Sequence, residues 1–218
     1  MGKRIEKALE YGRIKALLNV LKLTDEEAYV HSIETANLVE QCLDIAKAQN
    51  ELEWDERECE SIIIGTLLHD IGKAFLPFGL QHTSNKLDIY EKSIINIHPI
   101  LGVVIIRDDE FDEIVNNIVL YHHEYADGTG YPILENKIMK EEDIPDYVWL
   151  VAYADKFEAM TSKRSFKIPK TYPEAWNDIL TLSREGKLPY KFTRLFGALV
   201  KDLSLLPIKE EDPLEITR

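Results

Sequence analysis

The stretch His-Asp-Ile-Gly-Lys at positions 69–73 decides the fold, because it joins a predicted buried helix to two metal-binding side chains. It directly follows the apolar run Ile-Ile-Ile-Gly-Thr-Leu-Leu at 62–68, which predicts a buried helix from about Asp55 to Gly72. Gly72 suits the end of such a helix. Side chains on consecutive helical residues point about 100° apart, so this imidazole and carboxylate can together grip a metal lying over the helix end.

A single His-Asp pair is more often a helix cap or a satisfied pair in the core than a metal site. The other histidines and acids of this chain favour the metal site. Five of the six histidines lie in contexts that suit ligation, namely His31, His69, His98, His122 and His123. Carboxylates accompany them at Glu27, Asp70 and Asp155. Imidazole and carboxylate ligands without thiolates suit Fe, Mn or Zn, and a bridging carboxylate favours more than one metal.

The order of these residues resembles the HD-GYP family, whose members are metal-dependent phosphodiesterases that hydrolyse cyclic di-GMP. The resemblance runs from about His31 to about Lys167 and is carried most specifically by His-His-Glu-x-x-Asp-Gly-Thr-Gly-Tyr-Pro at 122–132. The chain departs from the family pattern at Glu158, where the family has aspartate, and at Ser165 and Phe166. A second-sphere role and a solvated side chain are equal alternatives for Glu158.

The fold that this resemblance implies is all-α, an HD-domain helical bundle around a bi- or trinuclear metal site. We expect residues 1–22 to form an N-terminal packing helix and residues 23–185 the HD-GYP catalytic domain. Residues 186–218 are expected to form a C-terminal helix and an acidic tail. Apolar periodicity and capping signals predict further helices near 3–21, 24–48, 88–97, 100–107, 111–122, 145–161, 172–184 and 190–203.

The resemblance implies two or three divalent metals, with Fe or Mn favoured over Zn. The first metal is expected to take four ligands, which are His31, His69, Asp70 and Asp155. Asp70 is expected to bridge to a second metal held by His98, His122 and His123. Independently, an aspartate in the apolar helix 145–161 would cost several kcal/mol unless it were paired or metal-bound, which favours Asp155 as a ligand.

The sequence favours two roles for the Glu27 side chain equally. It lies four residues before His31 and shares a helix face with it, so it can help to hold a third metal. It also lies three residues after Thr24, a spacing typical of a capping box. His82, in the irregular segment 75–87, is expected to be a solvated loop residue rather than a ligand.

The mechanism implied is attack of a metal-bridging water on phosphorus, giving pGpG, GMP or both. Asp70 and Lys73 are the predicted catalytic residues, with Lys73 one helical turn from His69 as a cationic clamp on phosphate. Family resemblance further assigns substrate contacts to Tyr131, Arg164 and Lys167.

Composition narrows the class of protein. The 218 residues carry a net charge of −13, which argues against a partner such as a nucleic-acid polymer or an anionic membrane. Cys42 and Cys59 are isolated, as is typical of a reducing cytoplasm. No run of about 18 apolar residues is apparent, so we expect a soluble cytoplasmic protein with no membrane span. The sequence leaves open whether the protein forms a homodimer.

Three other readings share these residues: another HD-superfamily nucleotide or cyclic-dinucleotide phosphohydrolase, a diiron oxygenase or oxygen sensor on the same scaffold, and a catalytically silent effector-binding module. The intact set of ligand types argues against the silent module. The sequence leaves open the metal, the end product, the exact dinucleotide, the oligomeric state and the regulatory input.

Overall fold

The fold is all-α, as the sequence predicts. The computed structural model describes residues 2–51, 54–81, 88–107, 111–133, 138–163 and 168–204, and none of these lies in a β-strand. The α-helices are α1 (Lys3–Glu10), α2 (Gly12–Thr24), α3 (Glu26–Ala48), α4 (Glu56–Leu68), α5 (Phe78–Gln81), α6 (Ile89–Ile95), α7 (His98–Ile106), α8 (Glu113–Tyr121), α9 (Asp146–Thr161), α10 (Tyr172–Arg184) and α11 (Thr193–Ser204). Short 3-10 helices are η1 (Ile71–Phe75), η2 (Glu141–Asp143) and η3 (Tyr190–Phe192).

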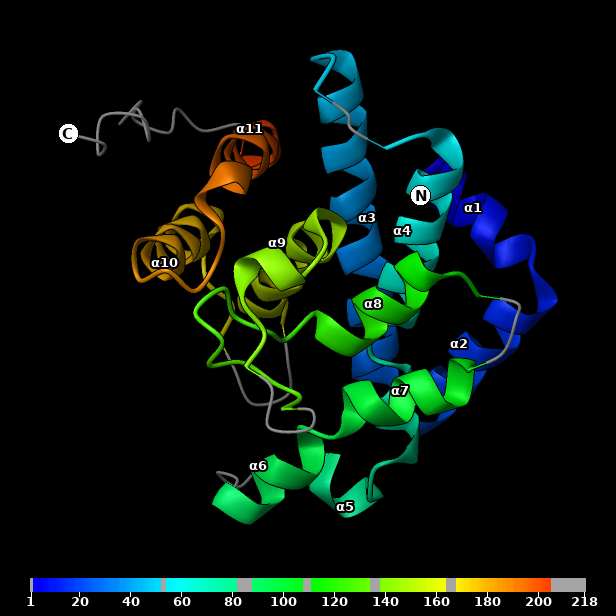
Figure 1. Cartoon of the computed structure of the whole chain (residues 1–218). Helices are drawn as coiled ribbons and strands as arrows, with labels where there is room; N and C mark the ends of the chain where they lie inside the picture. The colour runs from blue at the N-terminus through cyan, green and yellow to red at the C-terminus, as the bar shows by residue number, and fades with distance from the viewer. Residues whose placement is uncertain are drawn as a thin grey trace.

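The core lies where α3, α4, α8 and α9 pack together. Figure 1 shows the long α3 beside α4, with α8 and α9 against them. Helix α9 contributes the largest fully buried side chains, Trp149, Tyr153 and Phe157. Because α9 is buried on several faces, an acid in its buried part must find a partner inside the protein.

The predicted single helix at 3–21 is wrong, because the structure has two helices there. The chain leaves the helical conformation at Tyr11, with φ −71° and ψ 116°, and α2 begins at Gly12. Helix α1 packs on α3 and α4, whereas α2 packs on α3 and η1. With this break, Ile5 of α1 and Leu18 of α2 are both buried in the core.

The predicted capping box at Thr24 and Glu27 is also wrong. Thr24 is the last residue of α2, and its hydroxyl donates to the carbonyl of Val20 at 2.9 Å. Asp25 caps α3 instead, since its carboxylate accepts from the backbone N–H of Ala28 at 2.9 Å. The cap moved by one residue because α2 continues as far as Thr24, which a helix N-cap conformation excludes.

The C-terminal helices fold back onto the centre of the domain. Helix α10 packs on α9, and α11 packs on α10 and α3. The Tyr153 hydroxyl lies 2.6 Å from that of Ser183 and donates to the Pro189 carbonyl at 2.9 Å. These bonds satisfy a buried phenol and join α9 to the C-terminal helices.

The expectation that no stretch of about 18 residues is apolar enough to cross a membrane is not met. The segment Ile89–Ile106 is 18 residues long, with a mean hydropathy of 1.4 and 22% of it buried, so by length and composition it could cross a membrane. In the structure this segment is interrupted between α6 and α7 at Asn96 and Ile97. Helix α7 packs on η1 and α8, and it carries the buried His98. The packing of α7 therefore makes it part of the helical domain.

Arg4 ties the N-terminal helix to the core. Its side chain is only 8% exposed, and it pairs with Asp44 of α3 at 2.9 Å and with Glu56 of α4 at 2.8 Å. Its backbone N–H donates to the buried Glu40 at 2.8 Å. The guanidinium thus joins three helices at one point.

We expect Arg4→Met to lower the free energy of unfolding by about 1–2 kcal/mol, because charge-assisted hydrogen bonds to two partly exposed acids are lost. Urea unfolding followed by circular dichroism measures this. Lys7→Met, which removes the more exposed pair with Glu60, is the matched control and should cost less. Equal losses in the two variants would contradict the role given to Arg4.

Candidate metal centre

The candidate centre forms at the junction of α4 and η1. Helix α4 ends at Leu68, and the chain turns through His69 and Asp70 into η1. Both side chains are buried, at 0% and 1% exposed. A buried carboxylate at a chain turn needs a counter-charge or a ligand, so this turn defines the centre of the site.

Gly72 brings a second helix to this turn. A Cβ at Gly72 would lie 1.9 Å from the carbonyl oxygen of His98 and 2.7 Å from the backbone nitrogen of Gly102. Only glycine therefore allows η1 and α7 to touch, and this contact brings His98 up to Asp70. The sequence suggested a helix end for Gly72, but its role is this close approach.

The described residues place two groups of metal-binding side chains together. One group contains Asp70, His98, His122 and His123, and the other contains His31, His69 and Asp155. In each group the ligand atoms lie within 4.8 Å of one another. The seven side chains come from α3, the α4–η1 turn, α7, the end of α8 and α9, so segments far apart in sequence build the site (Figure 1).

The carboxylate of Asp70 faces both groups. Its Oδ1 lies 3.2 Å from Nε2 of His98 and 3.9 Å from Nε2 of His122. Its Oδ2 lies 3.5 Å from Nε2 of His69 and 3.8 Å from Nε2 of His31. This is the arrangement that a carboxylate bridging two cations requires.

Four imidazoles turn the same nitrogen toward Asp70. His69 donates from Nδ1 to the carbonyl of Thr66 at 2.7 Å, and His98 donates from Nδ1 to that of Ile95 at 2.9 Å. His122 donates from Nδ1 to the carbonyls of Ile118 and Val119, each at 3.1 Å. Nδ1 of His31 contacts the carboxylate of Glu158. In each ring Nδ1 is therefore the tethered nitrogen, and Nε2 is the nitrogen that faces the metal position.

The Nε2 lone pairs meet one another. The Nε2 atoms of His31 and His69 are 3.3 Å apart, as are those of His98 and His122. Lone pairs at this distance repel unless a proton or a metal cation lies between or beside them. Oδ1 of Asp70 is buried and has no hydrogen-bond donor within the described residues. The donor set therefore fits a divalent metal at each group.

Burial and charge keep these ligands in the states that a metal needs. Burial holds the pKa of His69 below its ordinary value, and the pKa of His122 and of His123 well below. Burial alone would raise the pKa of Asp70, but Lys73 and the neighbouring histidines outweigh it and hold that pKa well below the usual range. These three imidazoles are therefore neutral, and the carboxylate of Asp70 is ionised, near neutral pH.

His31 is the exception. Burial lowers its pKa, but Asp155 and Glu158 outweigh burial and raise it to about 9. Its Nε2 lies 2.9 Å from Oδ1 of Asp155, so in the metal-free protein a proton is shared where a cation would sit. A metal at this position must displace that proton.

Glu158 supports the site from behind. It is 3% exposed and contacts Nδ1 of His31, so it is not a solvated side chain. Of the two roles weighed from sequence, the contact favours orientation of His31 from the second sphere. The sequence could signal this only through its position three residues after Asp155 on α9.

The other predicted site residues lie outside the two groups of candidate ligands. Glu27 has an exposed side chain in the first turn of α3 and belongs to neither group, so its role at a third metal stays a prediction. Nζ of Lys73 lies 2.6 Å from Oδ2 of Asp70, with the side chain 20% exposed. The ring of Tyr131 lies against His123. Arg164, Lys167 and also His82 lie outside the described residues.

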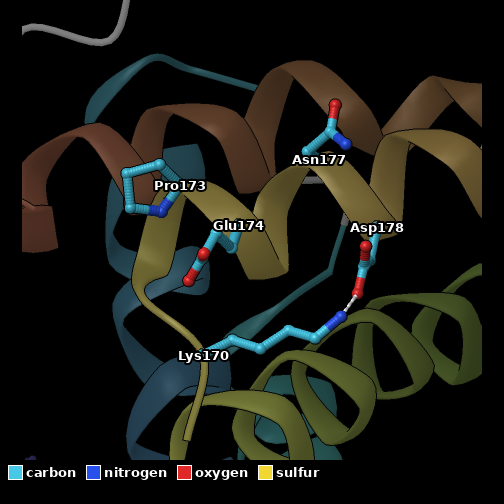
Figure 2. Close-up of a pocket in the computed structure, with 5 residues that line it drawn as sticks. All are labelled: Lys170, Pro173, Glu174, Asn177 and Asp178. Carbon is cyan, nitrogen blue, oxygen red and sulfur yellow. Dashed lines mark hydrogen bonds and ion pairs between the residues drawn. The ribbon is translucent and has the colours of Figure 1, made fainter.

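A separate depression lies on the surface of α10. Its lining, drawn in Figure 2, is Lys170, Pro173, Glu174, Asn177 and Asp178. Its volume is about 450 Å³. Lys170 pairs with Asp178 across it. No histidine of the centre lines it, so it is distinct from the candidate metal site.

Comparison with known proteins identifies the family. Residues 19–188 match the HD domain family, and the chain therefore belongs to it. The cyclic di-GMP phosphodiesterase PA4108 of Pseudomonas aeruginosa is 30% identical over 197 residues, covering 88% of this chain and 44% of that protein. The 3′3′-cGAMP-specific phosphodiesterase 2 of Vibrio cholerae is 36% identical over 118 residues, covering 53% of this chain and 22% of that protein.

The fold matches a solved HD domain. The L. monocytogenes phosphodiesterase PgpH HD domain, in complex with cyclic-di-AMP, aligns with a TM-score of 0.60 at 20% identity, covering 89% of this chain and 98% of that one. This likeness confirms the HD fold. The matches together confirm the HD-GYP resemblance drawn from the sequence. The chain spans less than half the length of the two curated relatives described above.

We expect Asp70→Ala to lose metal from both groups, because one carboxylate faces both. Metal analysis of anaerobically purified protein measures this, with circular dichroism to verify folding. Asp178→Ala, at the surface depression, is the matched control and should keep its metal. Full metal content in Asp70→Ala would show that this carboxylate does not bridge.

Glu158→Ala should weaken metal binding about 10- to 100-fold, because His31 loses the acceptor that orients it. Glu158→Gln should lose less, since an amide oxygen can still accept from Nδ1. Titration of the metal-free protein against a competing chelator gives both affinities. Identical affinities in all three proteins would argue against the orienting contact.

Proposed function

We propose that this protein is a metal-dependent phosphodiesterase that hydrolyses cyclic di-GMP. The observation that carries the proposal is Asp70, whose two oxygens face two pairs of imidazole Nε2 atoms. Such a bridging carboxylate is typical of two-metal hydrolysis of phosphate esters.

The substrate class rests on the relatives. The similarity to a cyclic di-GMP phosphodiesterase covers most of this chain, and cyclic di-GMP is therefore the first substrate to test. The similarity to a 3′3′-cGAMP-specific phosphodiesterase, at a higher identity over a shorter stretch, favours a mixed cyclic dinucleotide as the second candidate. Both are cyclic dinucleotides with two phosphodiesters, so the proposed chemistry is the same.

We propose two divalent metals as cofactors, one for each group of ligands, with iron or manganese preferred over zinc for a mixed imidazole and carboxylate set. Such metals supply an activated water for attack on phosphorus and take up charge on the phosphoryl oxygens. A third metal near Glu27 remains an open part of this proposal.

The residues of the chain provide orientation and charge. Four imidazoles are tethered through Nδ1, so their Nε2 atoms need little reorganisation to act as ligands. Lys73 and His123, each 20% exposed, are more open to solvent than the other side chains of the centre. We therefore expect the substrate phosphate to approach from their side. There Lys73 can exchange its contact with Asp70 for a phosphate oxygen.

A paired assay tests the proposal. Metal content is measured on anaerobically purified protein, and hydrolysis is followed with cyclic di-GMP, 3′3′-cGAMP and cyclic di-AMP as separate substrates. We expect turnover of cyclic di-GMP, with linear pGpG or GMP as product. Metal-replete protein that leaves all three substrates intact would overturn the proposed function. Oxygen consumption by the same sample would instead indicate a diiron oxygenase.

Lys73→Met should lower kcat/KM for cyclic di-GMP about 100- to 1,000-fold, the range for removal of one preorganised donor at a reacting anion. Metal content should stay at the wild-type value, because Lys73 is not a ligand. Lys170→Met, at the surface depression, is the matched control. Loss of metal in Lys73→Met would instead assign the lysine to holding Asp70 in place.

A further inference from the structure

His123 is held differently from the other histidines of the centre. The remaining four each have Nδ1 fixed by an acceptor. In the described part of the chain, the nearest acceptor recorded for His123 is Oδ2 of Asp155, 3.7 Å from Nδ1 and beyond hydrogen-bond distance. Its side chain is also 20% exposed, against 5% or less for the others. Something other than a hydrogen bond must orient this ring.

Aromatic rings surround His123 instead. The ring of Tyr131 lies 4.6 Å from it between centroids, at an interplanar angle of 32°. The imidazoles of His122 and His98 lie at 4.1 Å and 5.1 Å. His98 and His122 are themselves candidate ligands. Among the described residues, Tyr131 therefore provides the recorded ring contact to His123 that does not come from a candidate ligand. Offset packing of this kind restricts how an aromatic ring can turn.

The loop that carries Tyr131 is pressed onto the backbone of His123. The N–H of Tyr131 donates to the carbonyl of His123 at 3.3 Å. A Cβ on Gly130 would lie 2.5 Å from that same carbonyl oxygen and equally close to backbone atoms of Glu124 and Tyr125. The glycine therefore permits the contact that places Tyr131 over the imidazole.

We infer that Tyr131 is a positioning residue for His123, acting through its ring rather than its hydroxyl. It replaces the hydrogen-bonded tether of the other four imidazoles, and so completes the group of Asp70, His98, His122 and His123. This inference rests on the proposed metal centre. It adds a role for Tyr131 that is distinct from the substrate contact expected from family resemblance.

The first test uses the metal-free protein, so it does not depend on catalysis. The rate at which diethyl pyrocarbonate modifies His123 is followed by mass spectrometry. We expect Tyr131→Leu to raise this rate several-fold, since the ring that covers the imidazole is gone. Tyr131→Phe should keep the wild-type rate, because the packing ring remains. Tyr125→Leu is the matched control from the same loop, since the ring of Tyr125 lies beside Lys156 and Lys187.

The second test measures Mn²⁺ binding by titration calorimetry. In Tyr131→Leu, one class of site should weaken about 10-fold or more, while the class that includes His31 and His69 stays unchanged. Tyr131→Phe should restore both classes. Gly130→Ala serves as a second variant, because its Cβ must push the loop away while Tyr131 is still present. It should shift both readouts in the same direction as Tyr131→Leu.

Unchanged His123 modification in both Tyr131→Leu and Gly130→Ala would overturn the inference. So would a Tyr131→Phe variant that behaves like Tyr131→Leu, since the hydroxyl would then be the active group. Failure of the proposed function looks different. Wild-type protein would bind metal without hydrolysing any cyclic dinucleotide, while the effect of Tyr131 on His123 persisted.

Discussion

A single buried carboxylate, that of Asp70, organises this protein. It is 1% exposed and lies between two pairs of imidazole nitrogens, with Lys73 against one of its oxygens. A charge in that position would be strongly destabilising without partners, so the surrounding elements must supply positive charge and ligand atoms together. This requirement explains why helices from most of the chain converge on the short turn after α4.

The imidazoles that converge on Asp70 are held by hydrogen bonds to the backbone. Three imidazoles, those of His69, His98 and His122, donate to carbonyls within four residues of themselves, so each ring is fixed to the backbone at a helix end. The relative positions of their Nε2 atoms are then set by how helices α4, α7 and α8 pack. Gly72 and Gly130 remove the Cβ atoms that would keep these segments apart. The packing of the helical bundle therefore sets the geometry of the site.

His31 and His123 depend on longer-range support. His31 is oriented by Glu158, 127 positions away in sequence, and His123 by the ring of Tyr131. His31 is buried within the centre, whereas His123 is partly exposed. Lys73 and His123 together form its more accessible side, and this is the side from which we propose that an anionic substrate approaches. The net charge of −13 on the whole chain is compatible with this, because local cations dominate the field at short range.

The sequence by itself determined the helical class, the approximate helix positions, the ligand types and the family, since apolar periodicity and motif order are local properties. It did not predict the break at Tyr11 or the cap at Asp25, because both depend on which surface the first helices must cover. Only the tertiary structure decided that Glu158 contacts His31 and that Tyr131 covers His123. The physical reason is that these contacts depend on the packing of helices and on loop conformation. In the clearest case, His31 and Glu158, the partners are 127 residues apart, a separation at which no local pattern specifies which side chains meet.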